Sequence, residues 1–117
     1  MNIVCEKTLL SNAIDGVSRA VTLRSSISAL EGIHMVADGF SLTLTCYNLE
    51  LAITITIEAN VRTPGECVLN AKLLGDMVRR MPSGEVELAL NDNGTVEIRG
   101  GTAKFELTAL NLNAFPA

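Results

Sequence analysis

An apolar pattern that occurs twice, 64 residues apart, is the feature of this sequence that most restricts its fold. Both copies have apolar residues at positions i, i+1, i+4, i+5 and i+8, which is the spacing of one face of an amphipathic helix of about three turns. A short apolar run precedes each copy, NIVC at 2–5 and ECVLN at 66–70. The sequence therefore predicts two similar helices, each entered from a strand. The two apolar stripes are Leu9, Leu10, Ala13, Ile14 and Val17, then Leu73, Leu74, Met77, Val78 and Met81.

After each predicted helix the apolar period changes to two, which is typical of strands with one buried face. Turn-like pairs such as Asp38-Gly39 and Asn93-Gly94 separate the runs, and RTPGE at 62–66 links the two halves. We expect one α+β domain over 1–117, a duplicated βαβββ with repeats at about 1–60 and 65–110. The two helices should lie side by side on the apolar face of antiparallel sheet. The predicted strands are 31–37, 41–46, 51–57, 85–90, 95–99 and 102–110.

Basic side chains gather in the second helical stretch. Lys72, Arg79 and Arg80 are three of the nine basic residues of a chain whose formal net charge is -4. Lys72 and Arg79 are two helical turns apart, so they share one face at a separation of about 10 Å. Asp76 lies at i+4 from Lys72 and i−4 from Arg80, where helix-surface ion pairs form. Taken alone, this pattern is more typical of a solvated, ion-paired helix face than of a binding surface.

Composition narrows the class of protein. A length of 117 residues and a hydrophobic content of 48% fit one folded domain, and with 3% aromatic residues its core must be aliphatic. The negative net charge argues against a protein that coats nucleic acid over its whole surface, so any contact with anions must be local. The first residues, MNIVCEKTLL, do not have the pattern of a signal peptide, and no apolar run could cross a bilayer. We expect a cytoplasmic protein without membrane contact.

Catalytic and metal sites are not indicated. Cys5, Cys46 and Cys67 are widely spaced without a Cys-x-x-Cys pair, so we expect reduced, apolar strand residues and no metal site. A single histidine, His34, is more typical of a structural or surface residue than of a general base. NDNG at 91–94 predicts a hairpin turn, because the residues after it do not supply the ligands of a calcium loop. With no catalytic motif present, we expect no enzyme, no catalytic residue and no cofactor.

Several longer strings carry a resemblance that covers the whole chain. They are LLSNAIDGVSRAV at 9–21, LRSSISALEGIHM at 23–35, ADGFSLTLTCYNLEL at 37–51, LNAKLLGDMVRRMPSG at 69–84 and NAFPA at 113–117. In this order and spacing they resemble the N-terminal domain of the bacterial sliding clamp, the beta subunit of DNA polymerase III. The sequence departs from the family at 26–30, where Ser-Ile-Ser-Ala-Leu replaces Thr-Leu-Pro-Ile-Leu, and at Asn48, which replaces an aspartate.

The resemblance implies a non-catalytic role in DNA replication. Family chains carry three such domains, of which this chain resembles the first, and two protomers close head to tail into a homodimeric ring around duplex DNA. The ring tethers the replicative DNA polymerase, is placed by a clamp loader and acts as a processivity factor. Its sheets form the outer wall and its helices line the hole. By this resemblance, Arg24, Lys72 and Arg79 would contact the DNA backbone without reading sequence.

The resemblance also implies a protomer interface. The last predicted strand, 102–110, would be a sheet edge that continues into the third domain of the neighbouring protomer, with Lys104 and Glu106 pointing outward. An alternative function from a different class is a stand-alone, non-catalytic interaction module whose paired helices bind an acidic protein partner. An enzyme with an unrecognised site is a third alternative.

Overall fold

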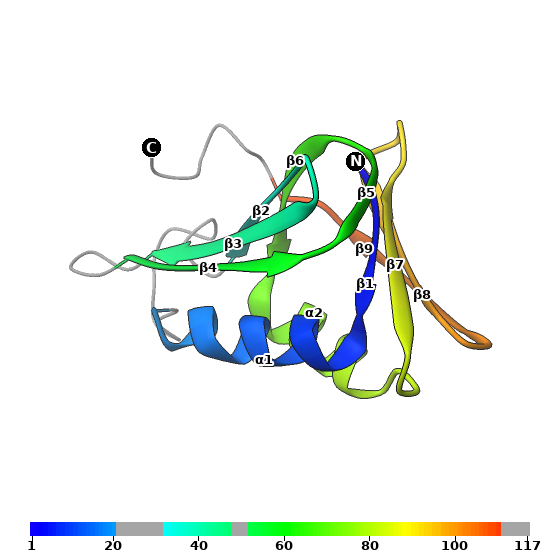
Figure 1. Cartoon of the computed structure of the whole chain (residues 1–117), viewed down its shortest axis with the longest axis horizontal. Helices are drawn as coiled ribbons and strands as arrows, with labels where there is room; N and C mark the ends of the chain where they lie inside the picture. The colour runs from blue at the N-terminus through cyan, green and yellow to red at the C-terminus, as the bar shows by residue number, and fades with distance from the viewer. Residues whose placement is uncertain (21–31, 48–51, 111–117) are drawn as a thin grey trace.

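The computed structural model describes residues 1–20, 32–47 and 52–110, and Figure 1 shows their arrangement. A first run of elements, β1-α1-β2-β3-β4, is followed by the short strand β5 and then by β6-α2-β7-β8-β9. That the backbone of residues 1–60 superposes on that of residues 65–110 remains a prediction. The bounds are β1 Asn2–Glu6, α1 Lys7–Val17, the 3-10 helix η1 Ser18–Ala20, β2 Gly32–Asp38, β3 Ser41–Tyr47, β4 Ala52–Glu58, β5 Asn60–Thr63, β6 Gly65–Asn70, α2 Ala71–Arg79, β7 Glu85–Leu90, β8 Thr95–Gly100 and β9 Ala103–Thr108.

The strands form two antiparallel sheets, and each run lends its first strand to the other run's sheet. In the five-stranded sheet the order is β5-β1-β7-β8-β9, so β1 pairs with β7 from Asn2↔Ala89 to Glu6↔Glu85. The other sheet has the order β4-β3-β2-β6, with β6 paired to β2. This exchange of β1 and β6 joins the two halves of the domain into one body.

The link between the halves is shorter than the sequence predicted. Residues 62–66 were expected to form a linker, but β5 ends at Thr63 and β6 begins at Gly65, so Pro64 alone lies between two strands. Strand β5 pairs with the edge of β1 that faces away from β7, with Ile3 opposite Val61. A four-residue strand that contains one half-buried residue has too little apolar alternation to be recognised from its sequence.

Both helices lie on the same side of the four-stranded sheet, as predicted (Figure 1). The first helix, α1, packs across β3 and β4, and it also contacts α2. Its first N–H group, that of Lys7, donates to the carbonyl oxygen of Gly84 at 2.8 Å. The second helix begins with a side-chain cap, because Asn70 Oδ1 accepts from the Leu73 N–H at 3.0 Å. The predicted α+β class with two adjacent helices is confirmed.

The core is aliphatic and continuous between the sheets and the helices. All residues of the two predicted apolar stripes except Leu9 and Leu73 belong to this core or pack against it. Leu9 and Leu73, at matching positions of the two stripes, are 42% and 47% exposed, contrary to the prediction that they are buried. At about 100° per residue, Leu9 lies about 90° from the centre of the buried side chains of α1, and Leu73 lies about 150° from the centre of those of α2. The largest fully buried residues are Ile3, Leu10, Ile14, Val17, Ile33, Met35, Leu42, Leu44, Leu69, Leu74, Leu88 and Ile98.

The predicted hairpin turn at 91–94 is confirmed. The Gly94 N–H donates to the carbonyl oxygen of Asn91 at 3.1 Å, and the Asn93 side chain accepts from both the N–H and the hydroxyl of Thr95. Gly94 has φ +83°, in the left-handed region that favours glycine. The polar side chains of this segment therefore close the β7–β8 turn.

Candidate nucleic-acid interface

A groove of about 340 Å³ runs between the exposed sides of α1 and α2. Gly75 lies in its floor, where a Cβ atom would come within 3.5 Å of Ile14 Cγ2 and 3.4 Å of Arg79 Nη1. Gly75 thus lies directly beneath the Arg79 guanidinium and faces Ile14 of α1. The lining residues are Ile14, Asp15, Ser18, Ala71, Lys72, Gly75 and Arg79.

Arg79 bridges the two helices. Its Nη1 donates to Asp15 Oδ1 on α1 at 3.3 Å, and its Nη2 donates to Asp76 Oδ1 one turn earlier on α2. The sequence predicted Asp76 as a partner of Lys72 or Arg80, but the structure pairs it with Arg79 at i+3. A guanidinium offers two terminal nitrogens in a fixed plane, so each nitrogen can bind a different carboxylate in a defined direction.

Lys72 is exposed on the same groove, two turns before Arg79. Within the described part of the chain its ammonium group has no carboxylate partner within ion-pair distance. The two predicted cations therefore share a groove, as expected, but differ in state: Lys72 presents an unpaired charge, while Arg79 is shared between two carboxylates.

Formal charge divides sharply between the helical layer and the sheets. Residues 7–20 and 71–80 carry five basic and two acidic side chains, a formal charge of +3. The remaining described residues carry three basic and nine acidic side chains, a formal charge of −6. An acidic protein thus presents a net basic helical face. The five basic side chains of the helical layer are Lys7, Arg19, Lys72, Arg79 and Arg80.

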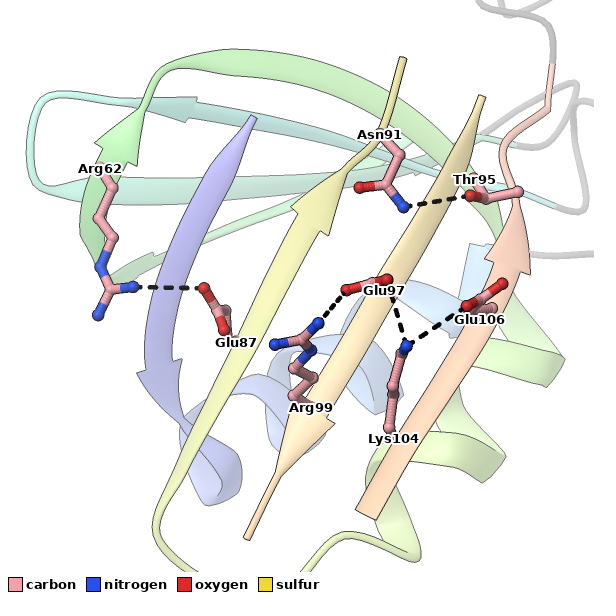
Figure 2. Close-up of polar contacts among 8 residues, drawn as sticks. All are labelled: Arg62, Glu87, Asn91, Thr95, Glu97, Arg99, Lys104 and Glu106. Atoms are coloured by element: carbon pink, nitrogen blue, oxygen red, sulfur yellow. Dashed lines mark hydrogen bonds and ion pairs between the residues drawn. The ribbon is translucent and has the colours of Figure 1, made fainter. Parts of the chain in front are cut away.

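On the opposite side of the molecule, the solvent face of the five-stranded sheet carries paired charges (Figure 2). Arg99 Nη2 on β8 donates to Glu97 Oε2 at 2.6 Å, and Lys104 Nζ on β9 lies 3.4 Å from Glu97 Oε1 and 3.6 Å from Glu106 Oε1. Desolvation raises the pKa of the Glu97 carboxyl group, but hydrogen bonds from Arg99 and Lys104 outweigh it, so its pKa lies below the ordinary value. The cations on this sheet face are therefore largely neutralised by neighbouring carboxylates.

Lys104 and Glu106 are both exposed on β9, as the sequence predicted. In the described residues β9 is the last strand of its sheet and pairs along its length with β8. Among the described residues, no strand pairs with its other edge before Leu110, whose N–H donates to the Val68 carbonyl oxygen on β6 at 2.8 Å. Within those residues the strand therefore offers unpaired backbone groups next to a cluster of charges.

One predicted site residue is not described by the structure, and one contact of the site was not predicted. Arg24, the third predicted DNA contact, lies outside the described residues. The partnership of Asp15 with Arg79 was missed, although the sequence contained a signal for it. The apolar stripes are offset by 64 residues, and Asp15 and Arg79 are also 64 residues apart. Opposite charges at matching positions of two adjacent, similarly patterned helices are good candidates for a direct contact.

The cysteines are free thiols, and all three are buried. Burial raises the pKa of Cys5, Cys46 and Cys67 to about 12, so the thiolate form is suppressed. No group of three or more His, Cys, Asp or Glu side chains within the described ranges could hold a metal ion. His34 Nε2 lies 3.1 Å from Glu66 Oε2 on the outer face of the four-stranded sheet. Neither described helix is long and apolar enough to cross a membrane.

Comparison with known proteins places this geometry in one family. Residues 1–117 match the family of the DNA polymerase III beta subunit, N-terminal domain. The "Beta sliding clamp" of Synechocystis sp. is 33% identical over 125 residues, which cover 100% of this chain and 32% of the relative. The "Beta sliding clamp" of Halalkalibacterium halodurans is 30% identical over 124 residues, covering 99% of this chain and 33% of the relative.

Solved structures agree with the sequence comparison. The sliding clamp structure from Bacillus subtilis covers 100% of this chain with a TM-score of 0.96 and 26% identity, over 33% of its own length. The pol III beta structure from Caulobacter crescentus gives a TM-score of 0.94 at 29% identity, covering 100% of this chain and 32% of its own. The chain therefore spans about a third of the length of the relatives it matches. By sequence and by fold, the chain belongs to the family of DNA polymerase III beta subunits and corresponds to their N-terminal domain.

Proposed function

We propose that this domain is part of a ring-shaped sliding clamp that encircles duplex DNA and tethers the replicative polymerase during processive synthesis. In this assignment, 1–117 is a single clamp-type domain, the first of three in a protomer that forms a homodimeric ring. A clamp loader places the ring on DNA in the cytoplasm. The domain has a mechanical and electrostatic role, and we assign no catalytic step to it.

The observation that carries this proposal is the division of charge between the two layers. A helical layer of formal charge +3 would face the phosphates of an enclosed duplex, while the acidic sheets would face outward. Contacts with phosphate carry no sequence information, so a ring held by them can move along the duplex. Lys72 and Arg79 line the groove of this layer, and we assign both of them, with Arg24, to backbone contact.

The edge strand β9 supplies the second part of the proposal. We assign it to the junction with the neighbouring protomer, where its open backbone groups would continue a sheet across the boundary. Lys104 and Glu106 flank this edge and are exposed. Their opposite charges, 3.6 Å apart on one strand, would favour a partner strand that carries the complementary order.

The test compares two double variants of the full-length protein with the same loss of charge. Lys72→Ala/Arg79→Ala removes two cations from the helical groove, and Arg62→Ala/Arg99→Ala removes two from the sheet face. We expect the first variant to bind duplex DNA more weakly, with a log–log salt slope shallower by about 0.9 for each phosphate contact removed. Retention of the loaded ring on circular duplex DNA should shorten in parallel.

The sheet-face variant is the control, because it has the same net charge as the groove variant. Its salt slope and retention should stay close to those of the unaltered protein. Equal losses in both variants would show a general charge effect and refute the assignment of the groove. If the unaltered protein binds an acidic protein partner through the helices but is not retained on circular DNA, the alternative interaction module is the better description.

A further inference from the structure

We infer that Asp15 and Asp76 compete with DNA phosphates for Arg79, so that the contact of Arg79 with the backbone is exchangeable while Lys72 supplies the firmer one. The inference rests on the proposed function and concerns how the same groove works. It begins from the observation that one of the two groove cations is already bound inside the protein. Each terminal nitrogen of Arg79 donates to a different carboxylate, one from each helix.

The geometry makes this competition direct. A phosphate binds a guanidinium best through two parallel hydrogen bonds, which use the same donors as a carboxylate pair. The Arg79 guanidinium lies over Gly75, with Nη1 at 3.4 Å and Nη2 at 3.8 Å from the position of a Cβ atom there. Each terminal nitrogen carries two N–H groups and already gives one of them to a carboxylate, so a phosphate that binds both nitrogens competes with Asp15 and Asp76 for a guanidinium that they orient and partly neutralise.

The charge balance points the same way. Arg79, Asp15 and Asp76 together carry a formal charge of −1, and with Lys72 these four side chains sum to zero. A phosphate that approaches Arg79 is therefore repelled by the carboxylates of Asp15 and Asp76 until one of these two side chains moves away. The side chains of Arg79, Asp15 and Asp76 are 52%, 57% and 42% exposed, so the internal pairs are screened by solvent and can open readily.

Such competition has a functional meaning for a ring that moves along DNA. Every phosphate contact must break and form again as the ring advances by one nucleotide. A carboxylate that takes the guanidinium as the phosphate leaves replaces one ion pair by another, which lowers the free-energy barrier between successive positions. Asp15 and Asp76 act as positioning residues for Arg79 in this scheme.

The experiment uses the full-length protein and a fluorescent linear duplex, with binding measured over a series of salt concentrations. Asp15→Asn and Asp76→Asn keep the shape of each side chain and remove its charge. We expect each variant to bind the duplex about two- to fivefold more tightly. The double variant should steepen the log–log salt slope by up to about 0.9, because one further phosphate contact forms. Its one-dimensional diffusion on stretched DNA should be slower.

Two controls separate this inference from a general effect of charge. Asp92→Asn makes the same change in net charge at the exposed β7–β8 turn, at the end of β7 away from the helices (Figure 1). In a protein that already carries Arg79→Ala, Asp15→Asn should have no more effect than Asp92→Asn. In addition, Arg79→Ala alone should reduce the salt slope less than Lys72→Ala alone.

The outcomes distinguish a failure of the inference about Arg79 from a failure of the proposed function. A gain in affinity for Asp15→Asn equal to that of Asp92→Asn, or a gain that persists without Arg79, overturns the inference while leaving the proposed function intact. An unaltered ring that is not retained on circular duplex DNA after loading contradicts the proposed function itself. Melting temperatures of all variants, measured in the same buffer, exclude unfolding as the cause of any change.

Discussion

Replacing Gly75 by alanine tests how closely α1 and α2 pack. Glycine in the interior of a helix is unfavourable by about 0.8–1.0 kcal/mol relative to alanine. Gly75 is buried in the middle of α2, and such a position between helices is usually taken to exclude a side chain. Here, however, the nearest atoms to a Cβ at this position are Arg79 Nη1 at 3.4 Å and Ile14 Cγ2 at 3.5 Å, which are ordinary van der Waals separations. The site therefore accepts a methyl group.

The expected effect of Gly75→Ala is stabilisation by about 1–1.5 kcal/mol, from helix propensity and the contact of the added methyl group with Ile14. For a domain of this size that corresponds to a rise in melting temperature of about 3–6 °C. The measurement is urea unfolding followed by far-ultraviolet circular dichroism, with a thermal scan in the same buffer. The ion pair of Arg79 with Asp15 should persist, because the guanidinium need not move.

Gly16→Ala is the matched comparison. Gly16 is the penultimate residue of α1, and a Cβ there would lie 2.5 Å from Ile55 Cδ1 on β4, so that side chain must shift. Its gain in helix propensity is also smaller near a helix end. We expect Gly16→Ala to be less stabilising than Gly75→Ala or to be destabilising. A loss of stability for Gly75→Ala would refute the packing argument, because it would mean that the helices cannot accept even a methyl group.

Two further predictions follow from burial. Leu74→Ala should lower the free energy of unfolding by about 2–5 kcal/mol, because Leu74 is fully buried. The neighbouring Leu73→Ala should change it by less than about 1 kcal/mol, since Leu73 is 47% exposed. Equal losses for the two variants in chemical denaturation would contradict this prediction. The three buried thiols, whose pKa values are raised to about 12, should resist alkylation by iodoacetamide at neutral pH. Cys5, Cys46 and Cys67 should react only as the protein unfolds or as the pH approaches that value. Labelling at neutral pH before unfolding would contradict their burial.

The sequence predicted the elements better than their exact contacts. Periodicity located both helices and the strands around them, because one-sided burial leaves a repeating apolar pattern. It placed Leu9 and Leu73 inside the core, since a stripe in the sequence gives the direction of a face but not the width of the surface that covers it. The strand β5 was missed because its four residues hold one apolar side chain, Val61, against the sheet.

The candidate site was predicted in part for a similar reason. Helical spacing identified Lys72 and Arg79 as neighbours on an exposed face, and the groove between the helices contains both. Spacing within one helix could not decide which acid pairs with which base, because the second partner of Arg79 comes from α1. The distance between Asp15 and Arg79 depends on how two helices pack, which is a property of the tertiary fold. The open edge of β9 was expected from resemblance alone and depends on the strand order of the whole sheet.

The exchange of β1 and β6 between the sheets has a consequence for how the chain can reach its native state. A chain emerging from the ribosome completes α1 early, but β1 must wait for residues 85–90 before its inner neighbour exists. Likewise, β2 lacks one of its two neighbours until residues 65–70 have appeared. Because both sheets need strands from distant parts of the sequence, folding is cooperative and late, and a truncated first half has no complete sheet. A proteolytic nick at the exposed Pro64 would leave two fragments that still hold one another through both sheets.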